Sequence, residues 1–284
     1  MSKHDPKLVT LHCREFDLEL GKETQIMGIL NVTPDSFSDG GQFNDSQNAL
    51  NHAIQMVKEG ADIIDVGGES TRPGSEVVSA KEEIKRVIPA IETLKKYINK
   101  PISIDTYKGE VAEAAIQAGA NIVNDVWGLQ KDPEMAPVVA HYKVPVIIMH
   151  NQEGTLYEKD IMETMIDFFN ESLRIAKEAG IPRDQIVIDP GIGFGKNLKQ
   201  NREVMNRLEE LRVLNLPILL GISRKSIIGQ TLDIPPHERL EGTIALNALG
   251  IHKGVDIIRV HDVKENLKAA RMIDAVVRGQ NESR

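Results

Sequence analysis

The chain has 284 residues, 41% of them hydrophobic and 27% charged, which suits one α/β barrel or two ordinary domains. Its formal net charge of −8 argues against nucleic acid or an anionic membrane as a partner. The single cysteine (Cys13) rules out a disulfide framework. The polar N-terminus has no apolar signal core behind it, and no apolar run approaches the roughly 20 residues of a membrane helix. We therefore expect a cytoplasmic protein.

The first predicted element is an N-terminal β-hairpin, because residues 8–20 alternate loosely between apolar and polar side chains. After it, short β-branched runs alternate with stretches of helical spacing. Strands are expected near residues 25–31, 62–66, 101–105, 121–125, 144–149, 185–189, 217–221 and 256–260. Helices are expected over Ala49–Glu59, Ala80–Tyr97, Gly109–Ala118, Asp160–Ala179, Glu238–His252 and Val263–Arg278. The last helix has Asp262 as its expected N-cap and Glu265 at capping-box spacing.

Two kinds of joint recur between these elements. In the first, a glycine ends the helix in the left-handed conformation and a short link leads into the next strand, at Gly60, Gly119 and Gly254. In the second, a proline takes the first position of the strand, at Pro101, Pro145 and Pro217.

The eightfold alternation of strand and helix predicts a (β/α)₈ TIM barrel. We expect one domain over residues 1–284, with the hairpin at 1–24 and the barrel at 25–280. The alternative is a doubly wound open sheet, which is less favoured because no composition shift or linker divides the chain.

Polar residues follow the expected strands at the ends where this fold carries its catalytic groups. In chain order they are Asn31, Thr71 with Arg72, Asp105, Asn124, His150, Asp189, Lys225, and Arg259 with His261. A polar ligand in the mouth of the barrel explains the whole set. Asp62 and Asp256 lie at strand starts, on the opposite face, where a structural role is expected.

Single members of this set also have ordinary explanations. Asp105 could cap the helix that starts near Lys108, and Asn124 could cap locally. His150 could be a buried core histidine. The glycines of residues 191–195 could only supply unusual backbone angles, and Arg72 and Lys225 could be solvated surface charges.

Taken together, these groups predict a flat heterocycle that carries an anion. The carboxylates of Asp105 and Asp189 can each accept two parallel N–H bonds from an aminopyrimidinone edge. Ser226 begins a helix whose N-terminal amides favour a carboxylate or phosphate. A second group suits phosphate and a metal ion, and consists of Asn31, Arg72, Arg259 and His261.

Several long motifs carry a family resemblance, and they are Gly28-Ile-Leu-Asn-Val-Thr-Pro-Asp-Ser-Phe-Ser-Asp-Gly-Gly, Asp65-Val-Gly-Gly-Glu-Ser-Thr-Arg-Pro-Gly, Ser103-Ile-Asp-Thr, Asn124-Asp, Asp189-Pro-Gly-Ile-Gly-Phe-Gly-Lys, Gly221-Ile-Ser-Arg-Lys-Ser and Arg259-Val-His-Asp. In these motifs and their order, the chain resembles the dihydropteroate synthase family along nearly its whole length. The resemblance implies a transferase that joins 6-hydroxymethyl-7,8-dihydropterin diphosphate to 4-aminobenzoate and releases diphosphate. It also implies Mg²⁺ as cofactor and a homodimer.

The resemblance further implies roles for individual residues. The pterin would be held by Asp105, Asn124, Met149, Asp189 and Lys225. Diphosphate would be bound by Asn31, Arg72, Arg259 and His261, with Asn31 also binding Mg²⁺. Two loops would close over 4-aminobenzoate with Phe37, Ser38, Thr71, Arg72 and Pro73, while Phe194 and Ser226 would line that site, where sulfonamides compete. The groups expected to act in catalysis are Asp105, Lys225, Arg259 and His261.

These assignments imply a dissociative reaction, in which diphosphate leaves first, Asp105 stabilises the pterin cation and Asp189 anchors the ring. Two alternatives share the pterin pocket. One is a catalytically silent pterin-binding paralogue. The other is a pterin-dependent methyltransferase domain, which would not need Ser-Thr-Arg-Pro or the Arg259 and His261 pair.

Overall fold

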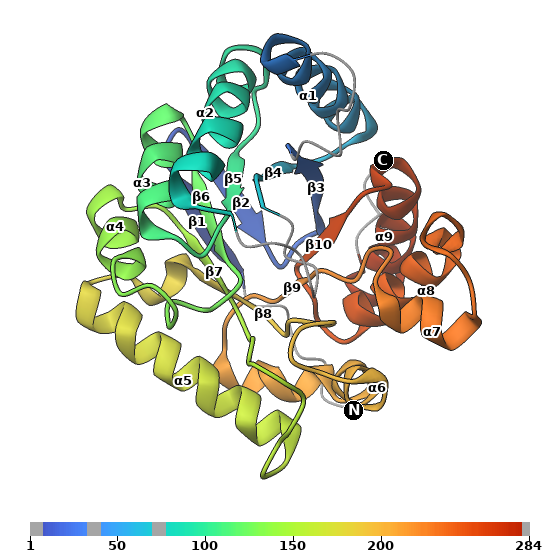
Figure 1. The fold of residues 1–284 in the computed structure, drawn as a ribbon. Coiled ribbons are helices and arrows are strands. Elements are labelled where there is room, and N and C mark those ends of the chain that lie inside the picture. Colours follow the sequence, from blue (N-terminus) through green and yellow to red (C-terminus); the bar gives the residue numbers. More distant parts are fainter. Residues whose placement is uncertain (1–7, 33–40, 70–77, 280–284) are drawn as a thin grey trace.

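Eight parallel strands form a barrel that is surrounded by helices (Figure 1). This computed structural model describes residues 8–32, 41–69 and 78–279. The barrel strands are β3 (Gln25–Asn31), β4 (Ile63–Gly67), β5 (Ile102–Asp105), β6 (Ile122–Asp125), β7 (Val146–Met149), β8 (Ile186–Asp189), β9 (Leu219–Leu220) and β10 (Ile257–Val260). Their order in the sheet is β8-β7-β6-β5-β4-β3-β10-β9, and a parallel bridge between Ile188 and Ile218 joins its two ends. The predicted (β/α)₈ barrel is therefore confirmed.

The helices that follow the strands are α1 (Gly41–Glu59), α2 (Ala80–Tyr97), α3 (Gly109–Ala118), α4 (Met135–Tyr142), α5 (Ile161–Ala179), α6 (Leu198–Asn206), α7 (Ser226–Leu232), α8 (Leu240–His252) and α9 (Val263–Val277). Three 3₁₀ segments are η2 (Arg183–Gln185), η3 (Leu208–Leu214) and η4 (Pro236–Glu238). In the parts of the chain described here, no helix has the length and apolar character needed to cross a bilayer.

Local sequence signals predicted most helix ends but missed two helices. The three glycines expected to end helices do have positive φ values, at 104° for Gly60, 133° for Gly119 and 97° for Gly254. Helices α4 and α6 went unpredicted because both are short, α4 is almost wholly apolar and α6 has only three apolar residues, so neither gives a long periodic signal.

The predicted side-chain cap on the last helix was wrong. Asp262 does precede α9, but its carboxylate makes no capping bond to the amides of that helix. It instead accepts hydrogen bonds from Arg224, including one from Nε at 3.0 Å. The guanidinium competes successfully with the helix amides, because a charge-assisted pair is stronger than a neutral cap bond.

The N-terminal hairpin closes the end of the barrel at which the strands begin. Strands β1 (Val9–Cys13) and β2 (Phe16–Leu20) pair antiparallel, as predicted. Their buried side chains form one apolar cluster with residues near the starts of the barrel strands, and this cluster comprises Leu11, Cys13, Leu18, Leu20, Met27, Ile63, Ile122, Ile147, Val187, Leu219 and Ile257. The shared cluster supports the prediction that hairpin and barrel make one domain.

Carboxylates at this end of the barrel bind backbone amides. The Oδ2 atom of Asp62 accepts from the amide of Ile26 at 3.0 Å, and Oδ2 of Asp256 accepts from the amide of Ile218 at 3.0 Å. These bonds fix the starts of neighbouring strands, in agreement with the structural role expected for both aspartates.

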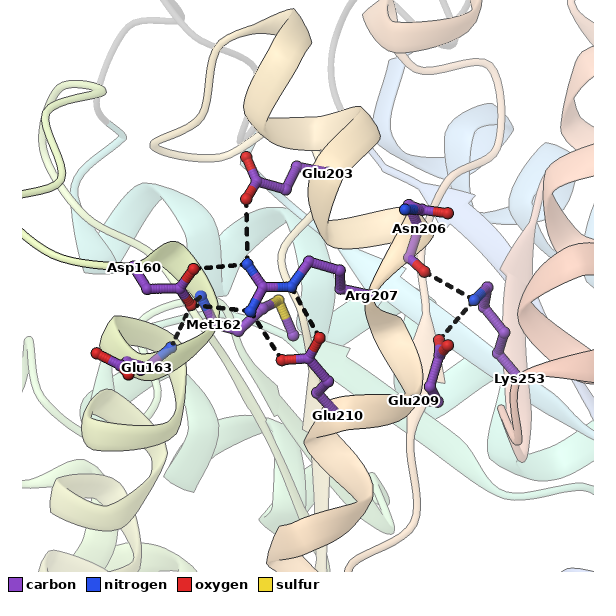
Figure 2. Close-up of polar contacts among 9 residues, drawn as sticks. All are labelled: Asp160, Met162, Glu163, Glu203, Asn206, Arg207, Glu209, Glu210 and Lys253. Carbon is purple, nitrogen blue, oxygen red and sulfur yellow. Dashed lines mark hydrogen bonds and ion pairs between the residues drawn. The ribbon is translucent and has the colours of Figure 1, made fainter. Parts of the chain in front are cut away.

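A cluster of charged residues on the outside of the barrel fastens α5, α6 and η3 together (Figure 2). The Arg207 guanidinium binds Asp160 with Nη1 at 2.6 Å and Nη2 at 3.1 Å, and it also binds Glu203 and Glu210. Asp160 is at the same time the N-cap of α5. Beside this cluster, Lys253 links the end of α8 to η3 through Glu209. Each exposed pair contributes little, but the shared guanidinium orders three elements at once.

We expect Leu11→Ala to lower the free energy of unfolding by about 2–5 kcal/mol, because it opens a cavity in the apolar cluster below the barrel. Urea unfolding measures the change. Thr10→Ala is the matched control, since Thr10 lies on the same strand with its side chain in solvent. Equal stability of the two variants would show that the hairpin does not share the barrel's core.

Candidate active site

Strand register brings the polar strand ends to one rim of the barrel. Asn31 is the partner of Gly67, Gly67 of Asp105, and Asp105 of Asn124. Farther round the barrel, Met149 is the partner of Asp189. Because Gly67 has no side chain, the space beside it is bordered by Asn31 Oδ1 and Asp105 Cβ, each 3.7 Å from the place that a Cβ would take.

Arg259 is the central cation of this rim. Its Nε donates to Asp65 Oδ2 at 2.6 Å, and its Nη2 donates to Asp105 Oδ2 at 2.6 Å. Asp65 Oδ2 also accepts from Asn124 Nδ2 at 3.2 Å. A guanidinium has five N–H donors, so these two bonds do not use up its capacity. The guanidinium thus bridges two buried carboxylates while keeping donors for a further anion.

The two carboxylates on Arg259 are only half satisfied. Asp65 Oδ1 and Asp105 Oδ1 are buried and have no hydrogen-bond partner in the part of the chain that the structure describes. Burial raises the pKa of Asp105 to about 7, helped by the nearby charges of Asp65 and Glu83 and opposed by those of Arg259 and Lys225. Unpaired carboxylate oxygens are costly to bury, so this arrangement suits a ligand that supplies N–H donors.

Asp189 and Lys225 form a second polar pair across the rim. Asp189 Oδ1 accepts from the amide of Gly191 at 2.8 Å. Burial raises the pKa of Asp189, although the charge of Lys225 opposes this shift. Burial also lowers the pKa of Lys225 to about 8, and Asp189 opposes that shift in turn. Burial therefore disfavours the charged form of both groups, and each group's charge favours the charged form of the other.

The loop after β8 holds an aromatic ring beside Lys225. The Lys225 ammonium lies 4.5 Å from the centre of the Phe194 ring and donates to the carbonyl of Ile192. Three glycines make this loop possible, with φ of 65° at Gly191, 86° at Gly193 and 56° at Gly195. At Gly191 a Cβ would lie 2.0 Å from the carbonyl oxygen of His150, so only glycine fits there.

The remaining described candidates lie around the same rim. His261 Nδ1 is 2.9 Å from Ser223 Oγ, and its amide donates to the same oxygen at 3.2 Å. Ser226 is the first residue of α7 and is exposed, as is Asn31 at the end of β3. Met149 is buried below the rim. Phe37, Ser38, Thr71, Arg72 and Pro73, assigned from the sequence, lie outside the described residues.

The ordinary explanations weighed for single residues have different outcomes. Asp105 does not cap α3, because the amide of Gly109 binds Asp132 Oδ2 at 2.7 Å. Asn124 binds Asp65 rather than a local amide. His150, by contrast, is the buried histidine that the simpler explanation predicts.

Two buried charged groups of the site were not among the predicted residues. Asp65 lies inside β4, and the only signal for it is a carboxylate within an otherwise apolar strand. Lys196 ends the Gly-rich loop after β8 and is buried against His150. Neither position follows from the rule that functional groups stand at strand ends.

The rim offers few side chains for a metal ion among the described residues. Among residues 8–32, 41–69 and 78–279, no cluster of three or more His, Cys, Asp or Glu side chains is arranged to bind one. Mg²⁺ keeps several waters and is often held by one or two protein oxygens together with phosphate oxygens. The exposed amide of Asn31 fits that pattern as a single protein ligand.

Comparison with known proteins identifies relatives for this chain. Residues 27–261 match the family described as pterin binding enzyme. Dihydropteroate synthase of Clostridium beijerinckii is 55% identical over 266 residues, which are 93% of this chain and 98% of that protein. The crystal structure of the Clostridium difficile dihydropteroate synthase in the presence of pteroic acid has 60% identity and a TM-score of 0.90, over 91% of this chain and 98% of that one. The Xanthomonas albilineans dihydropteroate synthase with 4-aminobenzoic acid has 40% identity and a TM-score of 0.90, over 95% of this chain and 98% of that one.

Proposed function

The chain belongs to the dihydropteroate synthase family of pterin-binding enzymes, and on this premise we propose how its rim residues join 6-hydroxymethyl-7,8-dihydropterin diphosphate to 4-aminobenzoate. The product of this transferase reaction is 7,8-dihydropteroate, with diphosphate as the leaving group. One observation carries the residue assignment, namely the buried carboxylate oxygens at Asp65 and Asp105 that lack a donor.

The pterin ring is bound by the carboxylates and the amide of the rim. Its aminopyrimidinone edge carries N–H donors, and the Asp189 carboxylate accepts two parallel hydrogen bonds from them, as it would from a guanidinium. Asp105 Oδ1 and Asn124 complete the contacts on the other side of the ring, while buried Met149 supports its face. Lys225 donates to a ring acceptor. This assignment is supported by the mixture of donors and acceptors at the rim and by the free capacity of Asp105 Oδ1.

The diphosphate is bound by Arg259, with His261 and Asn31 beside it. Arg259 donates two of its N–H groups to the carboxylates of Asp65 and Asp105, and its other N–H groups are suited to phosphate oxygens. Asn31 would hold Mg²⁺ beside the diphosphate, and the ion would supply positive charge that neutralises the leaving group. Phe194 and Ser226 line the 4-aminobenzoate site, and Phe37, Ser38, Thr71, Arg72 and Pro73 belong to loops that close over it.

The reaction proceeds by departure of the leaving group before attack by the amine. The bond between the methylene carbon and the bridging oxygen breaks, and its electron pair leaves with the diphosphate. Asp105 faces the methylene cation that remains and stabilises it, because a carboxylate in a buried site interacts strongly with a nearby positive charge. The lone pair of the aromatic amine then forms the new C–N bond, and the extra N–H proton leaves to solvent. A weakly basic amine needs no general base for this step.

We expect positional isotope exchange in pterin diphosphate labelled at the bridging oxygen, in the absence of 4-aminobenzoate. If the C–O bond breaks reversibly, the label reaches non-bridging positions before any product forms. The label is followed by ³¹P NMR of recovered substrate, because movement of the label between positions leaves the molecular mass unchanged. An unscrambled label, together with no trapped methylene adduct, would contradict departure before attack.

Asp189→Asn is expected to weaken pterin binding by roughly ten- to hundredfold, since one accepting oxygen becomes a donor that faces other donors. Binding is measured by calorimetry, and diphosphate release is followed in parallel with dihydropteroate formation. Asp184→Asn is the matched control, because Asp184 is exposed on η2 away from the rim.

These measurements also address the alternatives. Diphosphate release that matches dihydropteroate formation in the unaltered protein is the expected result. Tight pterin binding without release would instead indicate a silent paralogue. Unchanged pterin affinity in Asp189→Asn would remove Asp189 from the pocket.

We further propose a homodimer that forms through the outer faces of α8 and α9, which pack side by side (Figure 1). In α8, the polar residues Thr243 and Asn247 are buried, and Asn247 Nδ2 donates to Asn266 Oδ1 of α9, while Leu249 is exposed. On α9, Met272 and Val276 are 63% and 69% exposed and lie one turn apart. Exposed apolar side chains on adjacent helices are typical of a surface that a partner covers.

Leu249→Lys is expected to convert the dimer to a monomer, because it places a charge in the apolar interface. Sedimentation velocity measures the mass in solution. Leu156→Lys is the control, since Leu156 is 83% exposed in the loop after β7, outside α8 and α9. A dimer in both variants would place the interface elsewhere.

A further inference from the structure

Lys196 is a buried lysine whose three N–H donors all meet neutral acceptors. Its Nζ lies 2.8 Å from His150 Nδ1 and donates to the carbonyls of Gly191 at 3.1 Å and Phe194 at 3.0 Å. The side chain is buried, and within the described ranges it forms no ion pair with a carboxylate. Burying an ammonium in this way is costly, and burial lowers the pKa of Lys196 to about 7 despite the opposing charge of Asp189.

The partners of Lys196 lie directly after two neighbouring strands, β7 and β8, on the side of the rim assigned to the pterin. His150 directly follows β7, whereas Gly191 and Phe194 belong to the loop after β8. Burial keeps the pKa of His150 well below its usual range, so its ring is neutral and Nδ1 can accept from Lys196. The ammonium therefore joins the exit of one strand to the loop of the next.

Lys196 is bonded to the two residues of this loop that contact the proposed substrate groups, Gly191 beside Asp189 and Phe194 beside Lys225. The Gly191 peptide that it holds by its carbonyl also donates its amide to Asp189 Oδ1 at 2.8 Å. The Phe194 carbonyl that it holds belongs to the residue whose ring lies under the Lys225 ammonium. Two lysines thus hold the loop by its carbonyls. Lys225 donates to Ile192, and Lys196 donates to Gly191 and Phe194.

We propose that Lys196 is a positioning residue for the reaction, which sets the place of the Phe194 ring and thereby the fit of 4-aminobenzoate. This inference rests on the proposed function, because it assigns Phe194 to the amine's site. Lys196 contacts no substrate and acts only through the loop. Asp189 lies within β8 and is held there by the barrel sheet, whereas Phe194 lies in the loop after it, so the pterin pocket depends on Lys196 less.

The test replaces the ammonium while keeping the length of the side chain. Lys196→Met is expected to raise the KM for 4-aminobenzoate about tenfold and to change pterin affinity less than threefold. Lys199→Met is the matched control, since Lys199 lies three residues farther on with its side chain exposed. Steady-state kinetics at saturating pterin diphosphate give the KM, and calorimetry gives the pterin affinity.

A merely structural role predicts a different result. Loss of folded protein lowers the apparent kcat and the melting temperature but leaves KM unchanged, because KM does not depend on the amount of active enzyme. An unchanged KM for 4-aminobenzoate, relative to Lys199→Met, would therefore overturn the proposal. Equal losses for the two substrates would overturn it too.

Lys196→Gln serves if the methionine variant does not fold, because its amide keeps two N–H donors, one bond closer to the backbone than the ammonium. It is expected to raise the KM for 4-aminobenzoate about threefold, and no rise would refute the positioning role. If the unaltered protein forms no dihydropteroate, the proposed function fails. If it does form the product while both variants keep their KM, only the positioning role fails.

Discussion

The bridge from Arg259 to Asp65 and Asp105 is the interaction on which the rest of the site depends. Two carboxylates inside one barrel would repel each other if no cation stood between them. Arg259 lies 2.6 Å from an oxygen of each and so keeps both in a place where carboxylates are otherwise costly. Asn124 joins the same Asp65 oxygen, so three side chains from three other strands depend on one guanidinium.

In the proposed reaction, this arrangement lets one rim bind both the ring that becomes a cation and the departing diphosphate. Arg259 pairs with carboxylates through two of its donors, and the proposal assigns the others to phosphate oxygens. As the proposed leaving group departs, negative charge moves toward Arg259 on one side and positive charge develops near Asp105 on the other. The two groups lie next to each other before the reaction starts, so little reorganisation is needed.

The barrel separates the parts that stabilise it from the parts that react. At the start of the strands, the hairpin fills the interior with apolar side chains, and Asp62 and Asp256 bind backbone amides. At the other end, Asp65 and Asp105 each bury an oxygen that has no donor among the described residues, and two lysines, Lys196 and Lys225, have lowered pKa values. The closed sheet and the apolar cluster under the hairpin provide the stability that tolerates these buried charges at the rim.

The amino-acid sequence by itself determined the barrel, the hairpin, and the rim positions of Asn31, Asp105, Asn124, Asp189 and Lys225, because strand periodicity, helix-ending glycines and strand-end polarity are local signals. Only the tertiary structure decided which charges meet. In the structure Arg259 binds Asp65 and Asp105, although the sequence grouped it with Asn31 and His261. Asp262 binds Arg224, and its carboxylate makes no bond to the amides of α9. These partners are far apart along the chain, and side-chain pairing across a barrel depends on register and burial, which no local pattern encodes.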